Sequence, residues 1–313
     1  MPVLFCDNNP GKWGTIIEGV PVISFDELKK QYSDCEILIT SLTYHDEILH
    51  QLNENNLRVK IGIGMEVLWN EEYHNYFNLV RNHRELFSQV YSLLSDEYSK
   101  KIFYHKINYC ITANTKYLTP VQSKTGKYFD SEIITLSQNE VFIDGGAYMG
   151  DTAEEFLKQT GGVFKKVYSF EPEESKHKEF LKRIAAVKNI ELLPYGLWSK
   201  KEIMRFDSGN ASSSALNENG NLEVAVTSID EVLGSAPATF IKMDIEGAEF
   251  EALLGAEKTI KNYRPKLAIC VYHKPLDIVK IPLYIKNLVP EYKLYLRHYS
   301  DSSSETVLYA ILE

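Results

Sequence analysis

An apolar stretch runs directly into a glycine-rich turn at residues 141–152, and this turn offers backbone atoms to a ligand. The pattern Val141–Asp144 is typical of a strand, and it is followed by Gly145, Gly146, Ala147, Tyr148, Gly150 and Thr152. Glycines let the backbone approach a ligand closely and adopt conformations that a side chain would forbid. The Asp144 carboxylate, at the strand end, would repel a pyrophosphate and attract the cationic amino-acid end of S-adenosylmethionine. Gly150 opens a helix whose amide ends can face the methionine carboxylate.

A second acid lies at the spacing expected for a ribose contact. Glu171 follows Gly150 by 21 residues and ends the next apolar segment. An acid in this place can accept hydrogen bonds from both ribose hydroxyls, and Pro172 fixes the chain as it turns away. Alone, Glu171 would be an ordinary turn acid; together with Asp144 it favours a cofactor site. After a third strand, Gly196–Leu197 falls where an adenine would lie, although burial in the core explains Leu197 equally well.

Polar residues at the ends of two later strands are candidates for the transfer chemistry: Asp244, Glu246, Glu249 and His273. A hydroxyl acceptor is a weak acid and must lose its proton during attack on a methyl sulfonium. His273 ends a strand and titrates near neutral pH, which makes it the leading general base. Asp244 ends the preceding strand and would face the cleft near the methyl group, in contact with the cofactor. Glu249 is the third catalytic candidate, although its charge would equally stabilise the start of a helix.

A divalent cation is the alternative to a side-chain base. Held by Asp244 and a neighbouring acid, the ion would make the acceptor hydroxyl easier to deprotonate. The acids show no clear ligand spacing. The sequence therefore assigns no metal ligand.

The elements that would position these residues alternate between strands and helices. From residue 140 onward the predicted strands are 141–144, 166–170, 191–193, 239–243 and 266–272, and the predicted helices are 152–159, 173–187 and 248–260. This alternation implies a parallel sheet. Two further strands, 292–299 and 305–312, are joined by a link so short that it permits only an antiparallel hairpin. The predicted fold class is α/β, a mostly parallel Rossmann-like sheet that closes in a hairpin.

A smaller α/β unit is predicted before this sheet. Strand-like pieces at 3–6, 36–40 and 58–63 alternate with a helix capped by Ser24, with Glu27 as its capping-box partner, and a helix at 44–53. The unit resembles the later part of a small Rossmann-like domain found in front of some sugar-modifying enzymes, through residues 5–10 and 19–24. It lacks the first strand and the glycine turn that would hold a pyrophosphate. We expect a scaffold or interaction domain, not a second cofactor site.

A connector is predicted between the two units. Apolar residues recur at helical spacing over residues 71–110, with a fresh helix start at Ser95–Glu97. We expect this segment to pack the units together and to roof the active site, and the loop 111–139 to turn Gln122 and Tyr128 toward the cleft. The predicted division is a small partial Rossmann-like domain at 1–66, a helical connector and loop at 67–130, and a methyltransferase domain at 131–313.

Residues from about 84 to the end resemble the FkbM family of methyltransferases. The motifs that carry the resemblance are Asp144–Thr152, Phe170–Pro172, Ile241–Glu249, Leu296–Ser300 and Glu305–Tyr309. The resemblance implies a seven-stranded methyltransferase fold, S-adenosylmethionine as donor, and O-methylation of a hydroxyl of a sugar, such as a surface polysaccharide precursor, or of a natural product. The N-terminal extension is not a general family feature and leaves the acceptor open. Residues 71–110, the loop 111–139 and the insert Ser208–Asn221, with Ser212, Ser213 and Ser214, are where we expect acceptor contacts.

Composition and charge limit the classes of function and of partner that the sequence allows. The net charge of −9 repels a phosphate backbone, so no nucleic-acid partner is expected. No stretch reaches the ~20 apolar residues of a membrane span and there is no leader, which predicts a cytoplasmic protein. The four cysteines lie far apart without a CxxC pair and are expected to be reduced, mostly buried thiols. A nicotinamide-dependent sugar oxidoreductase and a non-catalytic, cofactor-holding assembly protein stay open as alternatives, as does a homo-oligomer.

Overall fold

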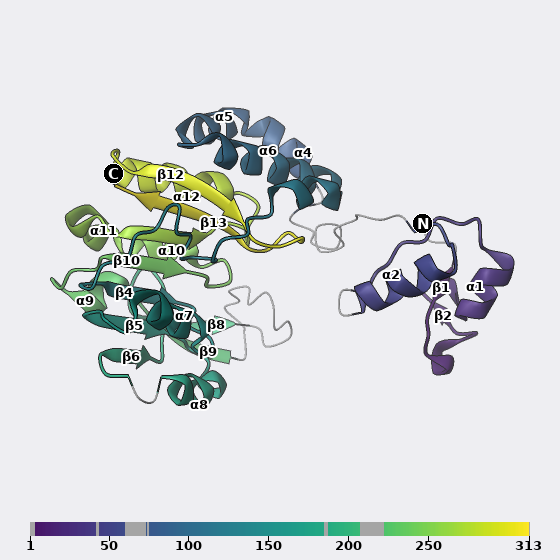
Figure 1. The fold of residues 1–313 in the computed structure, drawn as a ribbon, viewed down its shortest axis with the longest axis horizontal. Coiled ribbons are helices and arrows are strands. Elements are labelled where there is room, and N and C mark those ends of the chain that lie inside the picture. Colours follow the sequence, from purple (N-terminus) through teal and green to yellow (C-terminus); the bar gives the residue numbers. More distant parts are fainter. Residues whose placement is uncertain are drawn as a thin grey trace. The chain divides into compact units, whose positions relative to one another are not determined.

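The computed structural model describes residues 4–41, 44–59, 73, 75–184, 187–206 and 222–312. The chain divides into two compact units (Figure 1). The first comprises Met1–Met65 with Ala113–Thr115, and the second Glu66–Thr112 with Lys116–Glu313. Within the described residues, no helix is both long enough and apolar enough to cross a membrane.

The first unit is a small sheet with two helices. Its elements are β1 (Phe5–Cys6), β2 (Ile16–Ile17), β3 (Val20–Ile23), α1 (Phe25–Gln31) and α2 (His45–Glu54), with a short 3-10 turn at Pro10–Lys12. β3 pairs in parallel with β1 and antiparallel with β2. The predicted cap is confirmed, because the Ser24 hydroxyl accepts a hydrogen bond from the Glu27 amide at 3.2 Å.

The predicted strand 36–40 is seen only in part. Among the described residues, this segment makes a single parallel bridge, between Ile37 and Val59. Its expected partner strand, 58–63, lies mostly outside the described residues. The apolar side chains of this region nevertheless contribute to the unit's core, where Ile39 is buried with Ile23 and Leu52.

The second unit contains a seven-stranded sheet in the order β12-β13-β11-β10-β4-β5-β6. The strands are β4 (Val141–Gly145), β5 (Lys166–Phe170), β6 (Ile190–Leu193), β10 (Phe240–Met243), β11 (Lys266–Cys270), β12 (Lys293–His298) and β13 (Thr306–Ile311). The five neighbouring strands from β11 to β6 run in parallel, and β13 pairs antiparallel with both β11 and β12. The predicted fold class and its closing hairpin are confirmed. The order reverses beside β4, and such a switch point is where open α/β sheets bind ligands.

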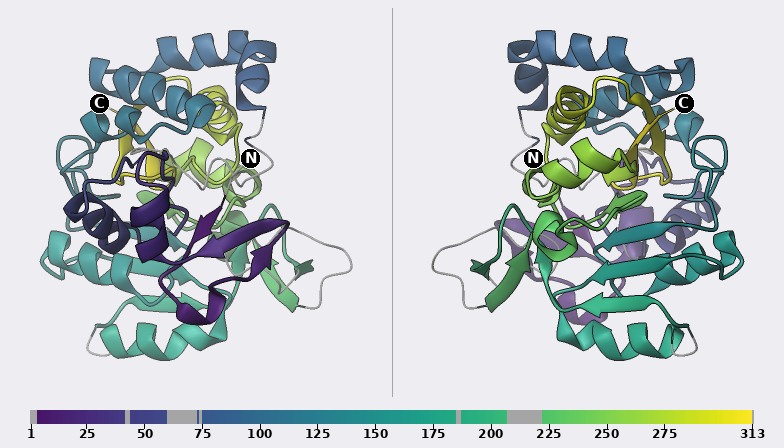
Figure 2. Two further views of the ribbon diagram at one scale, coloured as in Figure 1. Left: turned by 90° about the vertical axis from the view of Figure 1, so that its right-hand side faces the viewer. Right: turned by 90° about the vertical axis from the view of Figure 1, so that its left-hand side faces the viewer.

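Helices cover this sheet and one of its edges (Figure 2). They are α4 (Tyr76–Asn82), α5 (Arg84–Leu93), α6 (Glu97–Thr112), α7 (Asp151–Thr160), α8 (Glu174–Arg183), α9 (Ile229–Leu233), α10 (Glu249–Leu254), α11 (Glu257–Tyr263) and α12 (Asp277–Leu288), with 3-10 turns at Thr115–Tyr117 and Thr119–Val121. The helix predicted at 248–260 is instead the pair α10 and α11. The break lies at Gly255, where a Cβ would come within 2.2 Å of the Trp198 carbonyl oxygen.

The predicted helix start at Ser95–Glu97 is confirmed and joins α6 to the edge strand β12. The Asp96 carboxylate accepts a hydrogen bond from the Ser99 amide at 2.6 Å and one from Arg297 at 2.8 Å. Ser95 and Leu294 exchange two hydrogen bonds, from the Ser95 amide to the Leu294 carbonyl and from the Leu294 amide to the Ser95 hydroxyl. The exposed edge of the sheet is thereby covered by the helical segment.

A second, three-stranded sheet follows β6, and the sequence pattern did not predict it. It contains β7 (Gly196–Leu197), β8 (Glu202–Phe206) and β9 (Leu222–Thr227), in the order β7-β9-β8. The insert Ser208–Asn221, with Ser212, Ser213 and Ser214, lies outside the described residues.

The core of the main sheet is aromatic, with Phe142 stacked on Phe156 and Phe240 at centroid distances of 4.7 and 4.9 Å. Phe129, from the segment predicted as a loop, packs edge-on against Phe142 and Phe240. This loop is therefore anchored by burial. Cys110 and Cys270 are buried, whereas Cys6 is exposed and Cys35 partly so.

Candidate active site

The glycine turn after β4 presses against the end of β10. Gly146 has φ +75°, and a Cβ there would lie 1.9 Å from the Asp244 carbonyl oxygen. Only glycine satisfies both that conformation and that contact. Gly150, at φ +88°, precedes the first residue of α7. Ala147 and Thr152 are buried behind the turn, and Tyr148 is 49% exposed on it.

Asp144, near the end of β4, forms an ion pair with a lysine. Its side chain is fully buried and lies 3.1 Å from the Lys242 ammonium nitrogen. Lys242 stands opposite Asp144 in the register of β4 and β10, and it also donates to the Gly145 and Gly146 carbonyls at 3.0 and 2.8 Å. Burial raises the pKa of Asp144, and the Lys242 charge opposes that shift. The pair therefore supports the turn, and a direct contact between Asp144 and the ligand stays a prediction.

Glu171 connects the turn to the loop after β5. Its two carboxylate oxygens accept one amide hydrogen bond each, from Tyr148 and Glu173, both at 2.9 Å. The residue is 8% exposed, and burial raises the pKa of its carboxyl. Each carboxylate oxygen has two lone pairs, so one lone pair on each is left for a further donor.

The predicted adenine residues adjoin the same turn. Leu197 packs so closely on Gly145 that a Cβ there would lie 2.7 Å from its side chain, and Gly196 lies beside Pro172. The structure therefore brings the residues predicted for the cofactor together around the ends of β4, β5 and β7.

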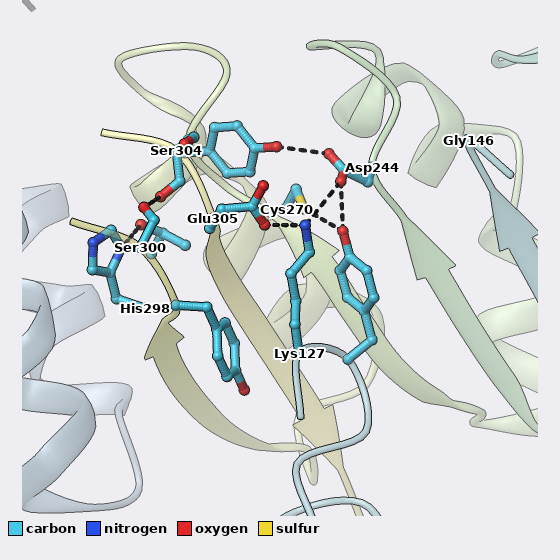
Figure 3. A network of polar contacts seen from close by, with 12 residues as sticks. Lys127, Gly146, Asp244, Cys270, His298, Ser300, Ser304 and Glu305 are labelled. Carbon is cyan, nitrogen blue, oxygen red and sulfur yellow. Dashed lines mark hydrogen bonds and ion pairs between the residues drawn. The ribbon is translucent and has the colours of Figure 1, made fainter. Parts of the chain in front are cut away.

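Asp244, just after β10, is held by residues that the sequence analysis mostly missed (Figure 3). Tyr128 and Tyr272 donate hydroxyl hydrogen bonds to it at 2.5 and 2.9 Å, and the Lys127 ammonium lies 3.5 Å away, between Asp244 and Glu305. Burial alone would raise the pKa of Asp244, but the charges of Lys242 and Lys127 and the Tyr128 hydrogen bond hold it far below its usual value. Asp244 is therefore ionised throughout the working pH range.

Of the two residues in the loop 111–139 that were predicted to face the cleft, one reaches the candidate site. Tyr128 reaches Asp244. Gln122 is exposed and forms a bridge with His298 instead. The contact of Lys127 was missed, and its only signal in the sequence is its place beside Tyr128 in an otherwise irregular stretch.

His273, after β11, lies among three carboxylates. Its Nε2 atom is 3.5 Å from Asp244 and 3.6 Å from Glu246, and its Nδ1 atom is 2.8 Å from Glu249. Burial lowers the pKa of His273, but the Glu249 carboxylate and the charges of Asp244 and Glu246 raise it to about 9. These neighbouring charges favour the protonated form of His273, and its role as a general base stays a prediction.

The connector approaches the segment that carries His273. Tyr73 and Tyr76 donate hydroxyl hydrogen bonds to the carbonyls of Tyr272 and Pro275, at 3.1 and 3.2 Å. Among the described residues, Asp244, Glu249 and His273 are close enough together to hold one metal ion.

Comparison with known proteins identifies a family and a similar fold. Residues 144–301 match the family model described as methyltransferase FkbM domain. The crystal structure of methyltransferase FkbM from Methylobacillus flagellatus is 24% identical, with a TM-score of 0.78 over 98% of this chain and 83% of that one. No curated protein sequence matches.

More distant structures also match in part. An rRNA methylase from Streptococcus thermophilus is 19% identical over 57% of this chain and 90% of that one, with a TM-score of 0.38. Aeropyrum pernix fibrillarin, in complex with natively bound S-adenosyl-L-methionine, is 12% identical over 59% and 73%, with a TM-score of 0.37. We draw nothing from these two low scores.

Proposed function

The chain belongs to the FkbM methyltransferase family, and from that premise we propose that it transfers the methyl group of S-adenosylmethionine to a hydroxyl of a sugar or natural product. One observation carries the proposal. The glycine turn after β4 stands between two acids, with Glu171 bound to its Tyr148 amide and the Asp244 carbonyl packed against Gly146. A ligand on this turn would have one acid at each end.

The cofactor is proposed to lie along the turn. Glu171 would accept hydrogen bonds from the ribose hydroxyls through its free lone pairs. Gly196–Leu197 and Pro172 would flank the adenine. The methionine carboxylate would face the N-terminus of α7, where unpaired amides and the helix dipole favour an anion.

Asp244 and His273 would stand at the acceptor end. The sulfonium is already electrophilic, so the residues mainly have to place the hydroxyl in line within about 3–3.5 Å of the methyl carbon. Asp244 remains negative and His273 positive at neutral pH, so together they can accept from and donate to the acceptor's hydroxyls. Glu249 orients His273 from the other side of the ring.

The first unit is proposed to be a scaffold or interaction domain. Its residues 5–24 form only a small sheet of three short strands. The glycine turn after β4 therefore remains the single proposed cofactor site.

Glu171→Gln is expected to weaken binding of S-adenosylhomocysteine by about 10–100-fold, because hydrogen bonds to a charged group contribute about 1.5–3 kcal/mol. Titration calorimetry on the full-length protein measures the loss. Glu173→Gln, on the neighbouring exposed acid, is the matched control and should bind like the wild type. Equal affinity of Glu171→Gln and wild type would remove the ribose contact from the proposal.

A further inference from the structure

Three side chains from three elements converge at the acceptor end of the site. Asp244 follows β10, Glu249 begins α10 and His273 follows β11. One ligand atom from each can be chosen so that all lie within 4.8 Å of one another. The 3.5 Å between His273 Nε2 and Asp244 Oδ1 is too long for a good hydrogen bond. It suits two neighbouring ligands of one ion, because bonds of about 2.0–2.2 Å place such ligands roughly 3 Å or more apart.

Polar atoms of this cluster are buried without a hydrogen-bond partner among the described residues. They include Glu249 Oε2 and His273 Nε2. Glu249 is fully buried, and its other oxygen accepts from the Ile245 amide at 2.8 Å. Nδ1 of His273 forms an ion pair with that oxygen at 2.8 Å, so Nε2, which faces Asp244, is the ring nitrogen left for a ligand. Buried polar atoms left unpaired are costly, so a missing partner is indicated.

The surroundings leave one side of Asp244 open to such a partner. Tyr128 and Lys127 both approach Oδ2. Among the described residues, Oδ1 accepts one hydrogen bond, from the Tyr272 hydroxyl, and faces His273. Lys127 therefore stabilises the charge of Asp244 at Oδ2 and leaves Oδ1, the oxygen that faces His273, accessible to a ligand.

Backbone strain marks the same loop. Glu246 has φ +55° and Gly247 φ +91°, both in the left-handed region. A strained non-glycine residue between two ligand candidates is typical of a functional site. This turn lets the chain bring both Asp244 and Glu249 to His273.

We propose that one oxygen each of Asp244 and Glu249 and one ring nitrogen of His273 bind a divalent cation, of the Mn²⁺ to Zn²⁺ series, which also takes the acceptor hydroxyl as a ligand. Mixed imidazole and carboxylate ligands suit these ions better than Ca²⁺ or Mg²⁺. The inference rests on the proposed methyl transfer, which it completes.

With His273 as a neutral ligand, the ion itself would supply the activation of the acceptor hydroxyl. Coordination makes the hydroxyl easier to deprotonate. Its oxygen bonds to the methyl carbon while the carbon–sulfur bond breaks, and the sulfur keeps that electron pair as a thioether. The proton passes to Glu246, which is exposed beside the cluster, and from there to water.

Mn²⁺ titration of the chelator-treated, full-length protein tests the site without any methyl acceptor. The electron paramagnetic resonance signal of free Mn²⁺ should show one saturable site per chain. Glu249→Gln and Asp244→Asn should each weaken Mn²⁺ binding by at least about tenfold, whereas Glu251→Gln, the same change elsewhere on α10, should bind like the wild type. Two ligand variants keep the test decisive if one of them fails to fold. Absent saturable binding, or unchanged binding in both ligand variants, overturns the site.

S-adenosylhomocysteine binding, measured on the same samples, distinguishes a failure of the ion site from a failure of the proposed methyl transfer. Cofactor binding without Mn²⁺ binding overturns the ion site and leaves the proposed methyl transfer standing. Mn²⁺ binding without cofactor binding supports the ion site and contradicts the proposed function.

Discussion

Asp244→Asn is expected to lower the rate of methyl transfer by about 10²–10⁴-fold while changing S-adenosylhomocysteine affinity by less than about threefold, because proton removal and metal activation act mainly on the transition state. The substitution keeps the shape of the side chain and removes a negative charge. That charge is maintained by Lys242, Lys127 and Tyr128 and lies 3.5 Å from His273. Without it, neither the histidine nor an ion would be held at the acceptor end.

Initial rates at saturating cofactor, together with calorimetric binding of S-adenosylhomocysteine, measure this effect. Asp301→Asn, on the exposed link between β12 and β13, is the control for loss of a carboxylate. A rate within threefold of the wild type would show that Asp244 has no part in the chemistry. An equal loss of rate and cofactor affinity would assign it to cofactor binding alone.

Lys242→Met should lower the free energy of unfolding by about 3–5 kcal/mol, because removing one partner of a buried ion pair leaves the other charge uncompensated. The side chains of Lys242 and Asp144 are 2% and 0% exposed. Lys242 also satisfies the carbonyls of Gly145 and Gly146, so the glycine turn should loosen as well. Denaturant unfolding, followed by tryptophan fluorescence and by circular dichroism, gives the difference.

Two comparison variants make the result specific to the pair. Lys261→Met removes an exposed helical ion pair with Glu257 and should cost no more than about 0.5 kcal/mol. Adding Asp144→Asn to Lys242→Met should restore part of the lost stability, because no unpaired charge remains. If Lys242→Met lowered the free energy of unfolding no more than Lys261→Met does, the buried pair would not stabilise the turn.

The fold was predictable where the pattern was local. Apolar runs bounded by turn residues placed the strands of the main sheet, and the short polar link at 300–304 required the closing hairpin. The break at Gly255 was not predictable in this way, because it depends on the Trp198 carbonyl from a distant segment. The small sheet of β7, β8 and β9 was missed because none of its strands is joined to its partner by a short turn, so the pairing is not visible in the local pattern.

Several residues of the site could be predicted from the sequence, whereas their roles could be predicted less well. Spacing placed Glu171, Asp244 and His273 at strand ends, and the structure brings Asp244 and His273 together. The burial of Asp144 depends on the register between β4 and β10, and a single sequence carries no register between distant strands. The pKa of His273 likewise depends on three carboxylates whose convergence appears only in the folded chain.

A crystal structure of the protein grown with S-adenosylhomocysteine and excess NAD tests the cofactor assignment most directly. The account predicts the homocysteine compound along Gly145–Gly150, with its ribose hydroxyls on Glu171 and its sulfur toward Asp244. Density for NAD at this turn, or a turn that holds neither compound, would contradict it.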